Sequence, residues 1–336
     1  MINLSLKYKK KNNLALESNI ISKINKNDIL IKVHSCGICG SDLKILKGGS
    51  NRVKKNVVLG HEISGEIIYS IANKKFKKGQ NIILGADIPN KKNKDFAFGH
   101  EIDGGFQKYL TVKREILQAS PYYLTSKKID HEVTCLTEPL ACCINGIEKI
   151  DLKPNENVII FGAGSIGNMI SKLCILKGSK NVFLVDTNTS KTKNQSKSKK
   201  IHKLSFNNYK QKIFSILKNK NTIKYCFVAC SSPVAQNEAL KITSKNGSVN
   251  FFAGLRRQKG KDPIVKLNTN LIHYKQLKVV GSHGSEKKHI IKAAQLIINK
   301  KILLKDIISH VYSLKQANEA FRRLRSGNCT KIIIKP

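Results

Sequence analysis

Hydrophobic and polar residues alternate in short runs through the first 140 residues of the chain, and glycine and asparagine separate these runs. Alternation with a period of two is typical of half-buried β-strands. The strands that it predicts most clearly lie at 27–35, 63–70 and 80–85. The first part of the chain is therefore expected to be β-rich.

A different pattern begins near residue 157, where short, wholly apolar runs alternate with runs of helical period. Such an order is typical of buried parallel strands with helices between them. The pattern predicts strands at 158–161, 182–185, 226–228 and 248–252, and a helix at 166–176. Further along, it predicts helices at 287–299 and 315–325 and a strand at 331–335.

The fold class predicted from these patterns is α/β, with a doubly wound parallel sheet and a second, β-rich domain. A chain of 336 residues is longer than most single domains. We expect residues 148–284 to form the parallel-sheet domain. Residues 1–147 are expected to form the β-rich domain, to which the chain returns over 285–336.

The net charge of +39, from 61 Lys and Arg against 22 Asp and Glu, raises the question of nucleic-acid binding. Such binding normally concentrates basic residues on one face and adds aromatic residues for stacking. Aromatic residues make up only 6% of this chain, Trp is absent, and the basic runs are scattered. These runs are Lys9–Lys11, Lys74–Lys78, Lys91–Lys94, Lys191–Lys200 and Arg256–Lys261. The pattern favours solvated lysine faces over a nucleic-acid surface, and a polyanion-binding surface is the alternative.

The nine cysteines are an odd number, and the first residues contain no apolar signal-peptide core. No apolar run reaches the 18–20 residues of a membrane span. We therefore expect a cytoplasmic protein with reduced thiols and no membrane partner, in which one or two cysteines bind metal.

The segment Gly162-Ala163-Gly164-Ser165-Ile166-Gly167 lies between a predicted buried strand and a predicted helix. This is the context that the dinucleotide fingerprint GxGxxG requires. Gly162 permits a tight turn, Gly164 lets the backbone approach a diphosphate, and Gly167 lets helix and strand pack closely. Ser165 and Ile166, at the helix N-terminus, complete the candidate cofactor-binding segment.

Asp186 ends the next predicted strand, 19 residues after Gly167. A carboxylate at this place accepts hydrogen bonds from the adenosine ribose and repels a 2′-phosphate, which favours NAD over NADP. Lys191 and Lys193 follow closely and weaken this preference, so NADP remains open.

Candidate metal ligands are Cys39, His61, Glu62 and Glu138, which are of the residue types that bind catalytic zinc. Taken alone, each is ambiguous. Cys36 precedes Cys39 by three positions, and a second Gly-His-Glu occurs at 99–101. Spacing by itself does not separate the two Gly-His-Glu segments.

Four ordered motifs resemble those of the zinc-dependent medium-chain dehydrogenases, closest to the sorbitol (L-iditol) dehydrogenase-like polyol dehydrogenases. They are Cys36-Gly-Ile-Cys-Gly-Ser-Asp42, Val58-Leu-Gly-His-Glu-Ile-Ser-Gly-Glu66, Thr137-Glu-Pro-Leu-Ala141 and the Gly162–Gly167 fingerprint. The resemblance extends nearly end to end, through Asn270–Tyr274 and Val280–Gly284. It implies a GroES-like catalytic domain and a Rossmann nucleotide-binding domain.

The resemblance implies that Cys39 and His61 bind a catalytic zinc, with Glu138 as a direct or water-mediated ligand and Glu62 beside them. It implies that Ser41 relays the hydroxyl proton and that Asp42 holds the second imidazole nitrogen of His61. A turn-capping hydroxyl is the alternative for Ser41, and a charge at a helix N-terminus is the alternative for Asp42. His100 is expected to lie in a surface segment without a role.

Four cysteines that bind a structural zinc in this family have no counterpart here, where the sequence reads Asn90-Lys-Lys-Asn-Lys-Asp95. We therefore expect one zinc, without a structural zinc, together with NAD or NADP, in a homodimer or homotetramer. The implied reaction interconverts a secondary alcohol of a polyol and its ketone. The alternatives are a threonine 3-dehydrogenase, a dehydrogenase of a phosphorylated or cyclic polyol, or an inactive fold that acts as a cationic binding protein.

Overall fold

The computed structural model describes residues 1–21, 23–48, 52–71, 75–89, 96–188, 190–193, 198–218, 220, 222–255 and 263–336. Three stretches considered above lie outside these residues in whole or in part. They are the Asn90–Asp95 segment, residues 194–197 of the basic run at 191–200, and the whole basic run at 256–261. Lys74 of the run at 74–78 and the side chain of Lys193 also lie outside them.

The chain divides into two compact units, which are described separately. Unit 1 comprises Met1–Ala141 and Gly284–Pro336, and unit 2 comprises Cys142–His283. Helix α4 (Thr137–Ile150) contains the first boundary between them. The chain therefore leaves unit 1 once and returns to it once.

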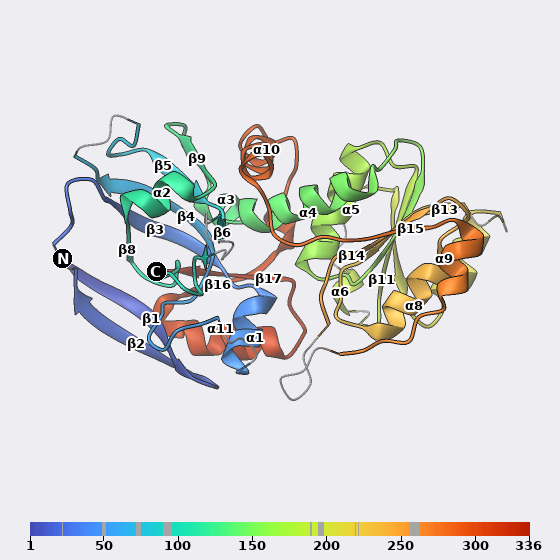
Figure 1. The fold of residues 1–336 in the computed structure, drawn as a ribbon, viewed down its shortest axis with the longest axis horizontal. Coiled ribbons are helices and arrows are strands. Elements are labelled where there is room, and N and C mark those ends of the chain that lie inside the picture. Colours follow the sequence, from blue (N-terminus) through green and yellow to red (C-terminus); the bar gives the residue numbers. More distant parts are fainter. Residues whose placement is uncertain are drawn as a thin grey trace. The chain divides into compact units, whose positions relative to one another are not determined.

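The core of unit 1 is a sheet that combines early and late parts of the chain (Figure 1). Its strands follow the order β16 (Ile308–Ser313), β17 (Lys331–Lys335), β3 (Ile29–Gly37), β4 (Glu62–Tyr69), β5 (Asn81–Leu84) and β9 (Tyr122–Thr125). Strand β8 (Tyr109–Val112) also pairs with β3. Two antiparallel pairs stand apart from this sheet: β1 (Ile2–Lys10) with β2 (Asn13–Ile20), and β6 (Asp87–Ile88) with β7 (Phe96–Ala97).

The helices of unit 1 are short except for one near the return of the chain. They are α1 (Gly40–Leu46), α2 (Arg114–Ala119), α3 (His131–Thr134), α10 (Lys287–Ile298) and α11 (Ala317–Arg325), with 3-10 turns at Lys305–Ile307 and Leu314–Gln316. Apolar side chains from strands and helices form one continuous core beneath the sheet. Phe106 and Phe321 meet edge to face in this core, at a centroid distance of 5.9 Å, and so connect the early and late segments.

Unit 2 is built on six parallel strands, four of which the apolar runs predicted. Their order is β12 (Ile201–Ser205), β11 (Asn181–Asp186), β10 (Asn157–Phe161), β13 (Ile223–Val228), β14 (Ser248–Phe251) and β15 (Lys278–Gly281). The order reverses direction at β10, which is the arrangement of the Rossmann fold. Its further helices are α5 (Ser165–Leu176), α6 (Ser190–Lys193), α7 (Tyr209–Ile216), α8 (Pro233–Ile242) and α9 (Thr269–Lys275).

Helices cover both faces of this sheet. Figure 1 shows α5 on one side of the strands and α8 and α9 on the other. The predicted fold class is confirmed, and the predicted strands and helices coincide with those of the structure to within about three residues. Nine strands of the described part of the chain were not predicted: β1, β2, β6, β7, β8, β9, β12, β15 and β16. In β1, β2, β12 and β16 the side chains are mostly half-exposed and lack a clear period.

Candidate metal centre and nucleotide-binding loop

The pairing of two antiparallel strands brings the candidate metal ligands together. Gly37 at the end of β3 lies opposite Glu62 at the start of β4. Cys39 therefore follows β3 at the same edge where His61 precedes β4. The motif that contains Cys39 and the motif that contains His61 meet because β3 ends at the edge where β4 begins.

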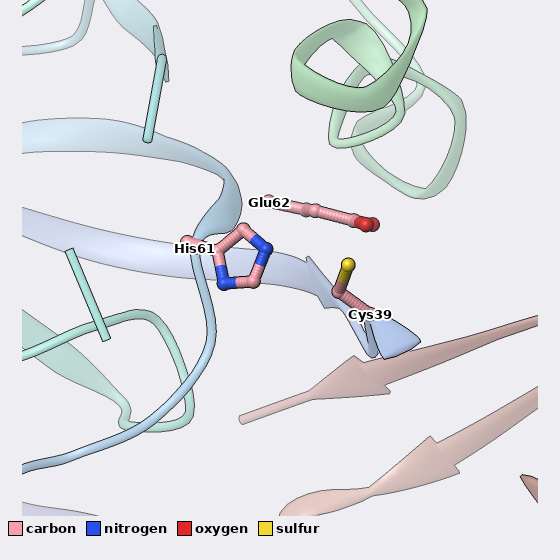
Figure 2. Close-up of side chains that lie close together, drawn as sticks. All are labelled: Cys39, His61 and Glu62. Carbon is pink, nitrogen blue, oxygen red and sulfur yellow. The ribbon is translucent and has the colours of Figure 1, made fainter. Parts of the chain in front are cut away.

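The side chains of Cys39, His61 and Glu62 point toward one another in Figure 2. Each offers a ligand atom, and these three atoms lie within 4.8 Å of one another. His61 and Glu62 are buried, and Cys39 is half-buried. Among the described residues, this is the set of His, Cys and acidic side chains with metal-binding geometry.

Two buried atoms of this cluster lack a hydrogen-bond partner within the described part of the chain: His61 Nδ1, which faces Asp42 Oδ1 at 3.7 Å, and Glu62 Oε2, which is available to a metal. A buried polar atom without a partner is unfavourable unless another ligand satisfies it. Sulfur, imidazole nitrogen and carboxylate oxygen are the donor set that zinc prefers. The residues present therefore fit a zinc ion.

Asp42 holds the backbone on both sides of the cluster. Its carboxylate accepts hydrogen bonds from the amides of Cys39 at 2.8 Å and Gly60 at 3.3 Å. Its Oδ1 lies 3.7 Å from His61 Nδ1, which is an ion-pair separation and too long for a hydrogen bond. The structure thus differs from the expected imidazole hydrogen bond, because the two backbone amides draw the carboxylate toward the Cys39 and Gly60 main chain.

Ser41 Oγ lies 3.4 Å from His61 Nε2, near the upper limit of a hydrogen bond. Burial lowers the pKa of His61, but the negative charges of Asp42, Cys39 and Glu138 outweigh burial and raise this pKa well above its ordinary value. The imidazole thus lies in a strongly negative environment, which also favours a bound cation.

Glu138 lies in the first turn of α4 and is buried, with 6% of its surface exposed. Its charge contributes to the raised pKa of His61, so it lies near the cluster. It is outside the set of three whose ligand atoms lie within 4.8 Å. The structure therefore brings three of the four predicted ligands into direct proximity.

Lys331 was missed by the sequence analysis. Its Nζ donates to Glu62 Oε1 at 2.5 Å and to the carbonyl of Ile38 at 3.0 Å, and the residue is 3% exposed. Burial lowers the pKa of Lys331, but the negative charges of Glu62 and Cys39 raise it by more. The net pKa of Lys331 therefore lies above its ordinary value. The signal in the sequence was a lysine that begins an otherwise apolar strand, but its partner depends on the order of strands.

Gly37 makes room for the Glu62 carboxylate. A Cβ at Gly37 would overlap with Glu62 Oε2 and crowd the Lys331 side chain. Glycine at position 37 therefore leaves the space that the Glu62 carboxylate occupies.

His100 was expected to lie in a surface segment without a role, and the structure places it beside the cluster. Its ring lies 5.7 Å from the ring of His61, and the residue is partly buried. Burial and the nearby His61 lower the pKa of His100. The adjoining Glu101 holds this turn, since it binds Arg52 Nε at 2.7 Å and accepts from the Ala97 amide at 3.0 Å. The second Gly-His-Glu thus packs against the first.

The glycine-rich segment of unit 2 forms a tight turn into α5. Gly162 adopts φ = +108°, and a Cβ at Gly167 would overlap with the Gly162 carbonyl oxygen. A Cβ at Gly164 would meet nothing within 4 Å, so the backbone at the helix start is open to a ligand. Ser165 and Ile166 begin the helix and are half-buried. The helix N-terminus and the open backbone fit a diphosphate.

Asp186, at the end of β11, is fixed beside this turn. Its Oδ2 accepts from the Ala163 amide at 2.7 Å, and its Oδ1 accepts from the Asn188 amide at 2.8 Å. Lys191 in α6 is half-buried. The carboxylate is therefore oriented by the backbone before any ligand is present.

No helix in the described part of the chain is both long enough and apolar enough to cross a membrane.

Comparisons with known proteins agree with this geometry. Residues 25–122 match the alcohol dehydrogenase GroES-like domain. The chain is 25% identical to a sorbitol dehydrogenase of Halalkalibacterium halodurans, over 93% of this chain and 92% of that protein. It is 26% identical to a D-arabitol-phosphate dehydrogenase of Enterococcus avium, over 94% and 91%.

Among solved structures, a putative zinc-binding dehydrogenase of Sinorhizobium meliloti, bound to NADP, matches with a TM-score of 0.87. The match covers both chains completely at 21% identity, which shows the shared fold. The chain thus has a GroES-like unit that gathers zinc-type ligands and a Rossmann unit, and it is similar over nearly its whole length to zinc-type medium-chain alcohol dehydrogenases.

Proposed function

We propose that this protein interconverts a secondary alcohol of a polyol and the corresponding ketone, with one zinc ion and NAD. The observation that carries the proposal is the cluster of Cys39, His61 and Glu62, whose ligand atoms lie within 4.8 Å of one another and in which the buried Glu62 Oε2 lacks a hydrogen-bond partner among the described residues. In this proposal unit 1 is the catalytic domain, with expected bounds of 1–147 and 285–336. Unit 2 is the nucleotide-binding domain, with expected bounds of 148–284.

Cys39 and His61 would hold the zinc, and either Glu62 or Glu138 would supply the carboxylate ligand. When bound, zinc supplies Lewis acidity, which lowers the pKa of an alcohol hydroxyl. Ser41 accepts the proton of that hydroxyl and passes it outward, which its distance of 3.4 Å to His61 Nε2 supports. Asp42 fixes the main chain at Cys39 and Gly60, so the ligands keep their positions during turnover.

The turn at Gly162–Gly167 binds the diphosphate of the nucleotide, and Asp186 binds the adenosine ribose. The preorganised carboxylate of Asp186 supports NAD over NADP, because a 2′-phosphate would meet a fixed negative charge. Lys191 is the nearest described cation in sequence that could offset this charge.

A polyol is the proposed substrate class because the cluster offers carboxylates and a hydroxyl that can bind neighbouring substrate hydroxyls. A site built around such hydroxyls rejects simple alcohols, since its polar groups would then lack partners. The sorbitol and arabitol-phosphate dehydrogenases among the relatives support the same class. We further infer that the protein is cytoplasmic and that it forms a homo-oligomer. Light scattering would test the second point. The support is strand β15, which pairs only with β14 among the described strands.

The test combines metal analysis with a substrate panel. Purified protein should contain about one zinc per chain, and zinc-free protein would contradict the enzymatic proposal. The panel comprises sorbitol, xylitol, galactitol, inositols, the phosphates of these compounds, threonine and ethanol, each with NAD and with NADP. Activity on polyols with NAD supports the proposal. Activity on threonine alone would place the protein in a different branch, and activity on ethanol alone would refute a polyol substrate.

A further inference from the structure

Three positively charged side chains from distant parts of the chain converge on one hollow in unit 1. Lys75 lies between β4 and β5, Arg114 begins α2, and Lys287 begins α10. The hollow has a volume of about 340 Å³. That volume falls within the range of about 300–1,000 Å³ that is typical of small-molecule sites. None of its lining residues belongs to the candidate metal centre or to the glycine-rich turn.

An aromatic ring forms the floor of this hollow. Tyr122 is 9% exposed and packs against Phe76 at a centroid distance of 5.1 Å. Lys75 Nζ lies 5.1 Å and Lys287 Nζ lies 5.7 Å from the centroid of the Tyr122 ring. The ring attracts each ammonium group through its π-face. It thereby holds two like charges near each other, although they repel.

The lining of the hollow is rich in donors, and no carboxylate is among its described residues. Besides the three cations it includes the side-chain amides of Asn27 and Gln118. Three acidic residues adjoin these positions in sequence, Asp28, Glu115 and Glu286, but none of them lines the hollow. Asp28 accepts from the Arg114 amide and from Asn25 Nδ2, both at 3.2 Å, and Glu286 pairs with Lys288 at 3.3 Å.

We propose that this hollow binds a small anion that carries a diphosphate group. An arginine offers planar paired donors for phosphate oxygens, and lysines add point charges. Three cations match the three to four negative charges of a diphosphate better than the two charges of a dicarboxylate. The concave shape and the aromatic floor distinguish this site from the scattered lysines of the remaining surface.

The experiment must separate this site from the nucleotide-binding loop and from the general positive field. Binding of inorganic pyrophosphate is therefore measured by calorimetry without nucleotide, because NADH itself carries a diphosphate and would compete for the hollow. The variants below leave the glycine-rich turn unchanged, so a loss of binding in them reports on the hollow. The test variant is K75A/R114A/K287A. The charge-matched control is K54A/K55A/K315A, whose lysines are exposed in unit 1 and do not line the hollow. Thermal unfolding confirms that both variants are folded, and metal analysis confirms that pyrophosphate has not removed zinc.

We expect one pyrophosphate per chain, an affinity loss of tenfold or more in the test variant, and less than a twofold change in the control. The dependence of affinity on salt should also become weaker in the test variant only. Equal losses in both variants, many weak sites, or no binding would overturn the proposal. If ADP competes with pyrophosphate and binds more tightly, the ligand of the hollow is a nucleoside diphosphate. If ADP and pyrophosphate bind with equal affinity, the hollow recognises the diphosphate group alone. Binding of pyrophosphate does not depend on catalysis. A failure of this proposal is therefore distinguishable from a failure of the proposed function.

Discussion

Lys331 and Glu62 form a fully buried ion pair across 269 residues of sequence, with Nζ 2.5 Å from Oε1. Lys331 also donates to the carbonyl of Ile38, so two of its three protons have acceptors. Burial of a carboxylate is costly unless a partner compensates its charge. The position of Glu62 in the candidate metal centre therefore depends on a residue near the other end of the chain.

Replacement of Lys331 by Met should lower the free energy of unfolding by about 3–5 kcal/mol, because it leaves a buried carboxylate without its cation. Denaturant unfolding, followed by circular dichroism, measures this change. The matched control is K335M, on the same strand, where Lys335 is 54% exposed and its pair with Glu132 contributes about 0–1 kcal/mol. The double variant E62Q/K331M should recover part of the loss. An equal effect of K331M and K335M would contradict the burial argument.

Cys39→Ala should abolish zinc binding and turnover while NADH binding persists, because the glycine-rich turn lies in the other unit. Metal analysis and NADH fluorescence measure the two properties. Cys36→Ala is the control, since Cys36 is buried beside the cluster but is not one of its three members. Loss of zinc in the control, or loss of NADH binding in Cys39→Ala, would show that the two sites are assigned incorrectly.

Gly37→Ala should reduce zinc affinity, because the added Cβ would displace the Glu62 carboxylate. The matched control is Gly40→Ala, three residues further on, where a Cβ would meet nothing within 4 Å. Zinc affinity is measured by competition with a chelator, and unfolding is followed in parallel. Similar behaviour of the two variants would mean that the placement of Glu62 does not govern metal binding.

Asp186→Ala should reduce or reverse the preference for NAD over NADP by roughly tenfold to a hundredfold. Hydrogen bonds to a charged group contribute about 1.5–3 kcal/mol, and each 1.4 kcal/mol corresponds to a factor of ten. The ratio of kcat/KM for the two nucleotides measures the change. Asp186→Asn keeps an acceptor and removes the charge, so it separates hydrogen bonding from repulsion of the 2′-phosphate. A wild-type preference for NADP would contradict the role assigned to Asp186.

Two stacked histidines predict a loss of stability in acid. The rings of His34 and His131 lie 4.3 Å apart. Burial, and then the neighbouring His34, lower the pKa of His131 to about 4. Burial lowers the pKa of His34, although Glu66, at 3.5 Å, opposes this effect. Lys32 and Lys335 also disfavour charge on this pair, and Asp130 favours it on His131.

Because the folded state binds these protons less readily than the unfolded state, the histidine contribution is complete above pH 6.5. It is lost as the pH falls from 6.5 toward 4. After allowance for solvent screening, the loss is on the order of 1 kcal/mol. Thermal unfolding at pH 8 and pH 5 measures this change. His34→Gln should weaken the pH dependence, whereas the exposed-site control His283→Gln should not; an unchanged dependence in His34→Gln would argue against the pair.

Local patterns in the sequence were sufficient to predict the parallel sheet and the glycine-rich turn, because each depends on a short segment with a strong period or a fixed spacing. The proximity of Cys39 to His61 was expected from the family resemblance, since spacing alone left two Gly-His-Glu segments open. Lys331, and the contact of His100 with His61, were missed because the partners lie across strands or turns that are distant in sequence. The hydrogen-bond partners of Asp42 could not be predicted, because the Cys39 amide, the Gly60 amide and His61 Nδ1 all lie near its carboxylate. Their distances differ by less than 1 Å, and the order of residues does not determine such differences.

The insertion of β17 between β16 and β3 has a consequence for synthesis on the ribosome. Residues 142–283 emerge before β17, so unit 2 can close its sheet while the Cys36–Gly37 end of β3 still has an unpaired edge. An open strand edge readily pairs with other chains. Newly made chains that stop before residue 331 would expose this edge and leave Glu62 without Lys331. Nascent unit 1 is therefore the part of the protein on which a chaperone would act.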